Sequence, residues 1–281
     1  MSGSLWEHLK PRQAAVEAAL AERLAAYTAD APPAVVAAMR YSLLAPGKRL
    51  RPLLAVLACE AVGGPMGQAM AAGCAVEMVH TYSLVHDDLP AMDDDDLRRG
   101  RPTCHKAFGE AVAILAGDAL LTLAFEVLAR SYPPAVAAVS CAELAAGAGG
   151  LGFLEDIHRR KTGALFRSAL RLGVYAAREL TEADEDPQVL GYIDRYAAAF
   201  GLAFQVTDDL LDVEGSAESA GKRVGKDAAR GKLTYPGLLG VDASRRKAAE
   251  LGQEAVAAAE RLGPGGRPLA DLARYVVERD R

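Results

Sequence analysis

Two aspartate-rich clusters, far apart in the chain, each end a largely apolar segment that is typical of a helix. The first occupies residues 87–93 and the second residues 208–212. Carboxylates gathered at helix ends repel one another unless a cation neutralises them. Hard divalent cations such as Mg²⁺ bind carboxylate oxygens and fill their other positions with water and phosphate oxygens. Because basic residues follow both clusters, the pattern predicts a site that holds Mg²⁺ and a diphosphate together.

The composition favours an all-α fold. Of the 281 residues, 51% are hydrophobic and 25% are charged, which supplies a sizeable core and argues against disorder. Alanine and leucine dominate the apolar set, whereas aromatic and β-branched residues are sparse. We expect helices over residues 5–28, 35–44, 53–62, 111–128 and 269–279, within a single helical domain that spans residues 1–281. The net charge of −5 argues against a nucleic-acid-binding protein.

The cysteines and the apolar segments bear on the compartment. Cys59, Cys74, Cys104 and Cys141 are widely spaced and form no CxxC pair, which favours buried free thiols in a reducing compartment. The first ten residues lack the continuous apolar stretch of a secretory signal. No apolar run approaches the ~20 residues that cross a bilayer. We therefore expect a cytoplasmic protein without a membrane span.

The second cluster places two carboxylates on one helix face. Asp208 and Asp212 stand four residues apart, which suits two ligands of one metal site. Solvated helix faces often carry the same spacing, so the spacing alone is only moderately specific. The flanking residues 204–206 and 210–211 are largely apolar, however, and an exposed face would be polar. The second cluster therefore favours the wall of a cavity.

The first cluster needs a distorted helix to act as a clamp. Asp87 and Asp93 are six residues apart, which puts them on different sides of an ideal helix at ~100° per residue. Pro90, between them, distorts or ends the helix. We expect this distortion to bring the two carboxylates together around a metal ion.

Two groups of basic residues are candidate phosphate ligands. Arg98 and Arg99 offer planar guanidinium forks that suit phosphate oxygens, although they could also be counter-charges to the aspartates before them. Lys48, Arg49 and Arg51 precede an apolar helix. Cations at a helix start are unfavourable against the helix dipole unless an anion is bound there. The sequence therefore predicts a second phosphate site at this helix start.

Several of these segments together resemble a known family. The run from His80 to His105 resembles the first aspartate-rich motif of short-chain trans-prenyl diphosphate synthases, and is closest to the bacterial farnesyl diphosphate synthases. Residues 47–52, 161–164, 204–212 and 221–227 resemble further motifs of that family, in the family's order. The resemblance extends from about residue 35 to 240. It implies antiparallel helices around a central cavity, usually in a homodimer.

The resemblance also implies a ligand set. Three Mg²⁺ ions would join the two clusters to the diphosphate of an allylic substrate. The metal ligands implied are Asp87, Asp88, Asp93, Asp208, Asp209 and Asp212. The residues implied to bind the allylic diphosphate are Arg98, Lys161, Lys222 and Lys232. The residues implied to bind isopentenyl diphosphate are Gly47, Lys48, Arg51, His80 and Arg99.

The implied reaction is head-to-tail prenyl transfer. Loss of diphosphate leaves an allylic carbocation, which the double bond of isopentenyl diphosphate attacks before a proton is lost. Lys161, Thr162 and Gln205 are placed to steady the cation with oxygen dipoles. No side-chain nucleophile is required.

Two residues before Asp87 are candidates for setting product length. The growing tail must run along the helix that carries Asp87, and Tyr82 lies about 7.5 Å below it at 1.5 Å per residue. Ser83 is more nearly in line with Asp87. In resembling synthases an aromatic residue at one of these positions limits the product to farnesyl diphosphate. If Tyr82 is ordinary core packing instead, a geranylgeranyl product follows.

The chain departs from the family pattern in two places. Pro46 stands where the family has glycine, and a Gly-Gly-Gln…Asp segment expected before Lys161 is absent. Either a helix-and-loop piece is deleted, or the printed sequence omits residues that the protein carries. We favour omission, because the loss of a helix from the cavity wall would expose apolar core.

Three alternatives differ in what they require. A geranylgeranyl diphosphate synthase shares every motif. A terpene cyclase usually replaces the second cluster with an Asn/Asp…Ser/Thr…Glu pattern, whereas Asp212 and Ser216 occupy its last two positions here. A non-catalytic partner subunit of such a synthase typically loses aspartates, and both clusters are intact. We therefore expect a farnesyl diphosphate synthase.

Overall fold

The computed structural model describes residues 2–149, 157–177, 187–214 and 234–279. The predicted all-α fold is confirmed, since almost every element is a helix. The elements in chain order are α1 (Ser2–Tyr27), α2 (Pro33–Leu43), α3 (Leu50–Ala61), η1 (Met66–Ala69), α4 (Met70–Asp87), β1 (Leu97–Arg98), β2 (Arg101–Pro102), α5 (Cys104–Phe108), α6 (Glu110–Ser131), α7 (Pro134–Gly149), α8 (Ile157–Ala177), α9 (Pro187–Glu214), α11 (Tyr235–Leu239), α12 (Val241–Glu260), η3 (Gly263–Gly266) and α13 (Arg267–Glu278).

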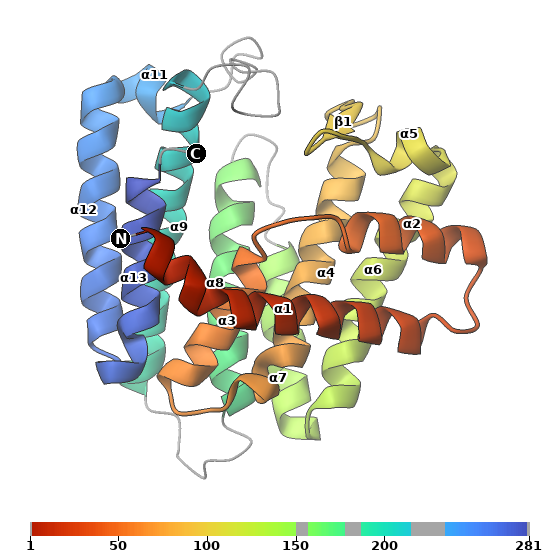
Figure 1. The fold of residues 1–281 in the computed structure, drawn as a ribbon, viewed down its shortest axis with the longest axis horizontal. Helices are drawn as coiled ribbons and strands as arrows, with labels where there is room; N and C mark the ends of the chain where they lie inside the picture. Colours follow the sequence, from red (N-terminus) through yellow and green to blue (C-terminus); the bar gives the residue numbers. More distant parts are fainter. Residues whose placement is uncertain (1, 150–156, 178–186, 215–233, 280–281) are drawn as a thin grey trace.

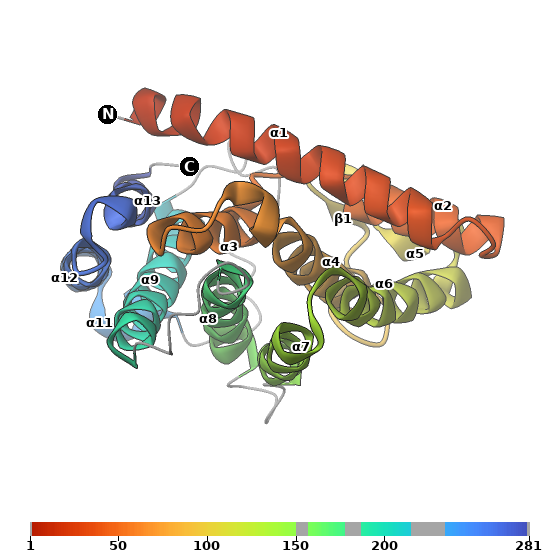
Figure 2. The same ribbon diagram turned by 90° about the horizontal axis from the view of Figure 1, so that it is seen from below.

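The long helices run side by side, and α1 and α2 cross one face of the array (Figure 1). Seen from below, α1 lies over α3 and α4, and α8 lies between α9 and α7 (Figure 2). Helix α8 contacts α3, α4, α7 and α9, so it is a central element of the bundle. The ends of α4 and α9, which carry the two aspartate clusters, lie at the same end of the bundle (Figure 1).

The apolar stripes predicted from sequence are buried. In α1, Leu9, Val16, Leu20 and Leu24 are at most 1% exposed, as their three- and four-residue spacing requires. Aromatic rings join α8 to α9: the ring centroid of Phe166 lies 5.3 Å from that of Phe200 and 5.2 Å from that of Phe204. Offset and edge-to-face pairs of this kind add to area burial. This aromatic cluster lies next to the second aspartate cluster, because Phe204 is one turn before Asp208.

Helix α6 corrects one sequence expectation. It has 22 residues, and an 18-residue window within it has a mean hydropathy of 2.0, so it is long and apolar enough to cross a membrane by length and composition alone. The statement that no apolar run approaches that length is therefore wrong for α6. Core helices of folded proteins meet the same criterion, and α6 packs against α2, α4, α5 and α7.

A two-stranded hairpin follows the first cluster and was not predicted. Leu97 pairs with Pro102 and Arg98 with Arg101, which leaves Arg99 and Gly100 as the two turn residues. Both have positive φ, +53° for Arg99 and +73° for Gly100, as a type I′ turn requires. A non-glycine residue in this region is strained by about 1–2 kcal/mol. The hairpin therefore fixes the direction of both arginines at a conformational cost.

Candidate active site

The backbone at the end of α4 brings Asp87 and Asp93 close to each other. Helix α4 ends at Asp87, and the chain then folds back on itself. The backbone amide of Asp93 donates to the carbonyl oxygen of Asp87 at 2.8 Å, and that of Asp94 donates to the carbonyl of Leu89 at 3.1 Å. Residues six apart, which an ideal helix would separate, are thus neighbours. The predicted effect of Pro90 on the helix end is confirmed.

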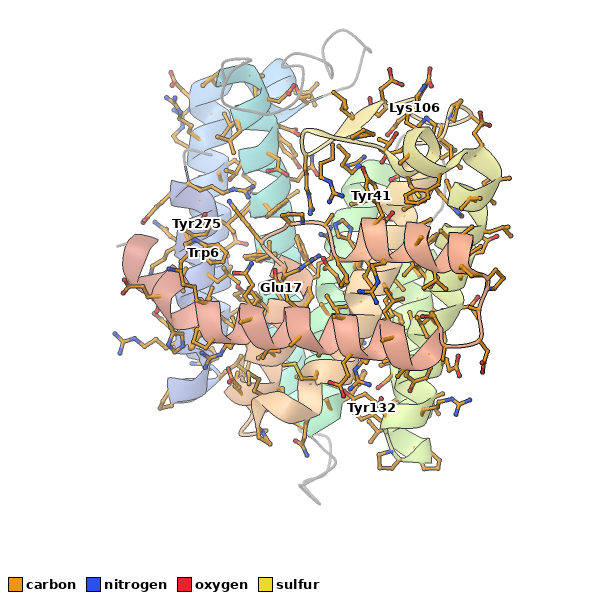
Figure 3. The ribbon with its side chains drawn as sticks, turned by 45° about the vertical axis from the view of Figure 1, so that its right-hand side comes forward. Trp6, Glu17, Tyr41, Lys106, Tyr132 and Tyr275 are labelled. Atoms are coloured by element: carbon orange, nitrogen blue, oxygen red, sulfur yellow. The ribbon has the colours of Figure 1, made fainter. Side chains whose placement is uncertain are left out.

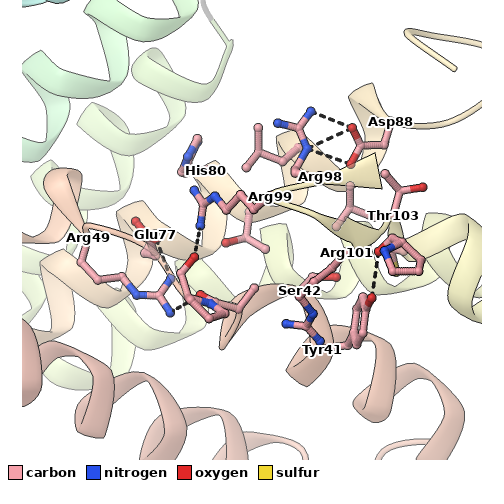
Figure 4. A pocket seen from close by; sticks show the side chains of 17 residues that line it. Tyr41, Ser42, Arg49, Glu77, His80, Asp88, Arg98, Arg99, Arg101 and Thr103 are labelled. Carbon is pink, nitrogen blue, oxygen red and sulfur yellow. Dashed lines mark hydrogen bonds and ion pairs between the residues drawn. The ribbon is translucent and has the colours of Figure 1, made fainter. Parts of the chain in front are cut away.

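Asp88 turns away from this loop and into an ion pair. Arg98 donates through Nε to both carboxylate oxygens of Asp88, at 3.0 and 2.9 Å, and through Nη2 to Oδ1 at 2.6 Å (Figure 4). The Asp88 side chain is only 4% exposed. A carboxylate paired with a guanidinium on both oxygens is committed to that partner. The structure therefore joins two predicted site residues to each other.

Arg99, on the other side of the hairpin turn, crosses to the loop before α3. Its Nη1 donates to the carbonyl oxygen of Pro46 at 2.7 Å (Figure 4). A Cβ at Gly47 would lie 2.5 Å from the same nitrogen, closer than van der Waals contact permits. Gly47 is thus required for the close approach of Arg99, which places the two predicted isopentenyl diphosphate ligands in contact.

The three basic residues at the start of α3 differ in their surroundings. Arg49, with φ +51°, turns inward and pairs with buried Glu77 at 2.9 Å, while Nη2 donates to the Ala45 carbonyl at 2.8 Å. Lys48 and Arg51 contact aromatic residues instead of Glu77. Lys48 Nζ lies 3.3 Å from the hydroxyl of Tyr275, a residue of α13. Arg49 is therefore a structural cation, which leaves Lys48 and Arg51 as phosphate candidates.

Arg51 is a buried cation with an unmet donor. Its guanidinium carbon lies 4.8 Å from the ring centroid of Phe166, a cation–π contact. Burial lowers the pKa of Arg51 to about 10, against the opposing charges of Glu77 and Asp208. Its Nε has no hydrogen-bond partner among the described residues. A buried guanidinium in this state is suited to receive an anion.

In the second cluster, adjacent aspartates face different surroundings. Asp209 is 6% exposed and accepts hydrogen bonds from Gln205 Nε2 at 2.8 Å and from the backbone amide of Tyr235 at 3.0 Å. Asp208 is more exposed and pairs with Arg279, the residue after α13. Asp212 is half-buried on the same face as Asp208. Asp209 thus ties α9 to α11, whereas Asp208 and Asp212 are less buried.

A cavity of about 110 Å³ lies beside the first cluster, between α2, α4 and the hairpin (Figure 4). His80 and Arg99, two predicted isopentenyl diphosphate ligands, are among its lining residues. Lys48 and Arg51 do not line it. The predicted ligands of this substrate are thus divided between the cavity and the start of α3.

The two candidate length-setting residues differ in their surroundings. Tyr82 is partly buried, and its ring packs edge-on against His86 with 5.6 Å between centroids. Burial and the charge of Asp87 raise the pKa of the Tyr82 hydroxyl. Ser83 is buried, and its hydroxyl donates to the His80 carbonyl at 2.8 Å. Tyr82 therefore lies within electrostatic reach of the first cluster.

Some predicted site residues lie outside the described part of the chain. Lys222 and Lys232 belong to segments that the structure does not describe, and Lys161 and Thr162 lie in α8 without described side chains. Within the described residues, no group of three His, Cys, Asp or Glu side chains is gathered closely enough to hold a metal ion. A metal ion bound here would complete its coordination with water or phosphate oxygens.

Two residues at the end of α13 contact predicted site residues, and neither was predicted from the sequence. Tyr275 contacts Lys48, and Arg279 contacts Asp208. No motif marks either residue. They stand four positions apart, which puts both on one side of the last helix.

Comparisons with known proteins agree with this geometry. Residues 32–149 and 153–261 match the polyprenyl synthetase family model. The farnesyl diphosphate synthase of Escherichia coli strain K12 is 44% identical over 273 aligned positions, which cover 88% of this chain and 90% of that protein. A chloroplastic geranylgeranyl pyrophosphate synthase of Capsicum annuum is 46% identical over 267 positions, which cover 86% and 71%.

Solved structures share the whole fold. An apo structure of an FPP/GFPP synthase from Zymomonas mobilis matches with a TM-score of 0.80 and 34% identity, and covers 99% of this chain and 100% of that chain. Geranylgeranyl pyrophosphate synthetase from Pyrococcus horikoshii matches with a TM-score of 0.84 and 26% identity, and covers 99% of both chains.

The segment missing before Lys161 is absent from the chain itself. The full sequence has 281 residues and runs on from Gly149 without a break, so the expectation of omitted residues is wrong. The family match stops at residue 149 and resumes at 153. The alignment with the E. coli protein spans 273 positions but takes in 88% of this chain, so roughly two dozen positions of that relative have no counterpart here. Helix α7 still packs against α8, and the hydroxyl of Ser168 in α8 donates to the backbone carbonyl of Glu143 in α7 at 3.1 Å.

Proposed function

Because this chain belongs to the polyprenyl synthetase family, we propose that it is a Mg²⁺-dependent prenyltransferase that condenses isopentenyl diphosphate with dimethylallyl and geranyl diphosphates to make farnesyl diphosphate. The unpartnered Nε of buried Arg51 carries the proposal most directly. The guanidinium of Arg51 is a desolvated cation whose pKa responds to the charge of Asp208 in the second cluster. A diphosphate would supply the acceptor that this donor lacks.

The carboxylates fit Mg²⁺ by their chemistry. Asp87, Asp93, Asp208 and Asp212 offer hard oxygen donors from two clusters, and three ions with a diphosphate would join them. When bound, Mg²⁺ would neutralise charge on the departing diphosphate. Arg51 and Lys48 would hold isopentenyl diphosphate, with His80, Arg99 and the Gly47 turn. Lys161, Lys222 and Lys232 would hold the allylic diphosphate.

Asp88 and Asp209 receive positioning roles in this proposal instead of metal ligation. Asp88 holds Arg98, and through it the hairpin, against the end of α4. Asp209 accepts a hydrogen bond from Gln205 Nε2. This bond orients the Gln205 amide and leaves its oxygen, the negative end of the amide dipole, available to a cation. Gln205, with the backbone of Lys161 and Thr162, would steady the allylic carbocation while isopentenyl diphosphate attacks it.

The proposed product is farnesyl diphosphate, with geranylgeranyl diphosphate as the alternative. Relatives of both kinds match this chain at similar identity, 44% and 46%. The partly buried ring of Tyr82, five residues before Asp87, supports the shorter product, because an aromatic ring there would block a growing tail. The side chain of Ser83, next to Tyr82, is small and would not block the tail.

We also propose a homodimer in the cytoplasm. Ile114 and Leu115 are 42% and 53% exposed on α6, where a solvated helix face would be polar. Val139 on the neighbouring α7 is also exposed. A second copy that covers this face would explain its composition. The free state of the four cysteines supports a reducing compartment.

The test is incubation of the purified chain with Mg²⁺, isopentenyl diphosphate and one allylic primer at a time, followed by measurement of product chain length. Farnesyl diphosphate from dimethylallyl and geranyl primers is expected, with no product in EDTA. A twenty-carbon main product would establish the geranylgeranyl alternative. Absence of condensation with every primer would contradict the proposal, and would make the segment missing after Gly149 the first feature to restore.

A further inference from the structure

The second aspartate cluster already has a cation against it. Arg279 lies at the end of α13, and its Nη2 pairs with Oδ1 of Asp208. Figure 1 shows this end of α13 beside α9, the helix that carries Asp208. The Arg279 side chain is 9% exposed, whereas that of Asp208 is 47% exposed. The contact is therefore buried on the arginine side and open to solvent on the aspartate side.

Arg279 is held in place by more than this ion pair. Its guanidinium carbon lies 4.2 Å from the ring centroid of Phe204, one turn before Asp208 on α9. A desolvated cation over an aromatic face is stabilised by the ring quadrupole. Its Nε, like that of Arg51, has no hydrogen-bond partner among the described residues. The fold thus keeps a partly unsatisfied cation next to a proposed metal ligand.

A cation in this position opposes metal binding. Mg²⁺ binds carboxylate oxygens through charge, and a guanidinium on the same carboxylate reduces that charge and occupies one oxygen. Among the described residues the carboxylates are not gathered around a metal site, and Asp208 pairs with Arg279 instead.

We propose that Arg279 is the built-in counter-cation of Asp208 and that Mg²⁺ must displace it to bind there. The inference rests on the proposed function, in which Asp208 is a metal ligand. In the metal-free protein Arg279 keeps Asp208 from repelling its neighbours Asp209 and Asp212. When the metal arrives, the guanidinium leaves the carboxylate and the end of α13 shifts with it.

The same helix contacts Trp6 of α1, whose fluorescence can report this shift. Tyr275, one turn before Arg279, packs edge-on against Trp6 with 5.3 Å between ring centroids (Figure 3). Trp6 is the only tryptophan of the chain. The hydroxyl of Tyr275 also contacts Lys48 Nζ at 3.3 Å. Displacement of Arg279 would therefore change the surroundings of Trp6 and its fluorescence.

The experiment measures metal binding without turnover. Binding of Mn²⁺ to the full chain is followed by loss of the free-ion electron paramagnetic resonance signal, for wild type, Arg279→Gln, Arg279→Lys, Asp208→Asn and the control Arg274→Gln. Arg274 is an exposed arginine of α13 that pairs with Asp271 and Glu260. Trp6 fluorescence is recorded during a MgCl₂ titration, and circular dichroism checks that each variant is folded.

Arg279→Gln is expected to bind Mn²⁺ up to about fivefold more tightly than wild type, which corresponds to ~1 kcal/mol for removal of one partly exposed ion pair. Arg279→Lys keeps the charge and should stay near wild type, as should Arg274→Gln. Mg²⁺ should change Trp6 fluorescence in wild type and much less in Arg279→Gln.

Two failures are distinguishable. If Asp208→Asn weakens Mn²⁺ binding while Arg279→Gln matches wild type, the counter-cation role is wrong and the metal assignment stands. If Asp208→Asn binds Mn²⁺ as wild type does, the metal assignment in the proposed function is wrong, and this inference falls with it. A wild-type fluorescence that does not respond to saturating Mg²⁺ overturns the displacement of Arg279.

Discussion

Arg98 donates three hydrogen bonds to Asp88, at 2.6 to 3.0 Å, and so fastens the hairpin to the end of α4. The pair is more buried on the aspartate side, 4% exposed against 24% for Arg98. The backbone of Asp95 also donates to the Asp88 carbonyl at 3.3 Å. Asp88 therefore organises the loop that carries Asp93 while its own carboxylate is committed to Arg98.

Asp88→Asn is expected to destabilise the fold as well as the site. Loss of one charge leaves Arg98 partly buried without its partner, and removal of one member of a buried pair costs roughly 3 kcal/mol. Denaturant unfolding of Asp88→Asn, Arg98→Gln and the double variant measures the coupling between the two residues. A double variant that is less stable by the sum of the two single effects would show that the pair does not act as a unit.

The sequence predicted the features that depend on local pattern. Helical periodicity predicted the buried apolar stripe of α1 and the shared face of Asp208 and Asp212. Pro90 predicted the end of α4 near Asp87. The same periodicity could also have predicted that Asp208 and Asp209 have different surroundings. Adjacent residues on a helix point ~100° apart, so when one faces the site its neighbour faces the core.

Features that depend on distant contacts were not predictable. Arg279 meets Asp208 only because α13 packs beside α9, and no local motif records that packing. The inward turn of Arg49 depends on Glu77, a residue of α4. The length and apolarity of α6 reflect the helices around it and are not a local signal of a membrane span.

Catalysis is expected to need carboxylates from both clusters. Asp87→Ala and Asp208→Ala should each lower kcat by at least about a hundredfold, since each removes a donor that places charge against the departing diphosphate. Steady-state assays measure the loss, and circular dichroism checks the helical content. Asp271→Ala, an exposed aspartate on α13, serves as the control. Near-normal turnover in either site variant, or full activity in EDTA, would contradict the metal assignment.

The exposed apolar face of α6 predicts the oligomeric state. Leu115→Glu places a charge on the face proposed to meet a second copy, and burial of an unpaired charge is strongly unfavourable. Light scattering after size exclusion should show a dimer for wild type and a monomer for the variant. Leu238→Glu, at an equally exposed leucine on α11, should remain dimeric. A monomeric wild type would refute the dimer.

A charge network between α7, α8 and α9 predicts the response to acid. Arg171 donates to Asp194 at 2.7 and 2.5 Å and to Glu143 at 3.0 Å. Burial alone would raise the pKa of Asp194, but the hydrogen bonds from Arg171 and the charge of Arg167 outweigh it and hold that pKa below its usual value. A carboxyl with a lowered pKa stabilises the fold above its unfolded pKa of about 3.9.

Asp194→Asn is therefore expected to lower the free energy of unfolding at pH 7 by about 1 kcal/mol, a value reduced for the partial exposure of the pair. The difference from wild type should shrink as the pH falls below about 4 and the aspartate becomes protonated. Urea unfolding at several pH values measures this. A difference that stays constant from pH 7 to pH 3 would mean that the ion pair is not its source.

Tyr82 is expected to set the length of the product. In the proposed reaction the growing tail would run from the end of α4 that carries Asp87 down along the helix, and five residues at 1.5 Å place Tyr82 about 7.5 Å below Asp87. Its ring is partly buried against the core and against His86. Tyr82→Ala removes the ring, so the product should lengthen by at least one five-carbon unit.

Product analysis with geranyl and farnesyl primers measures the change, and Tyr82→Phe separates the ring from the hydroxyl. The phenylalanine variant should keep the farnesyl product, because the ring alone blocks the tail. Ser83→Phe, one position closer to Asp87, should keep or shorten the product, since it adds a second ring beside the first. If wild type already makes mainly a twenty-carbon product, or if Tyr82→Ala leaves the product length unchanged, the ring of Tyr82 packs against His86 without limiting the tail.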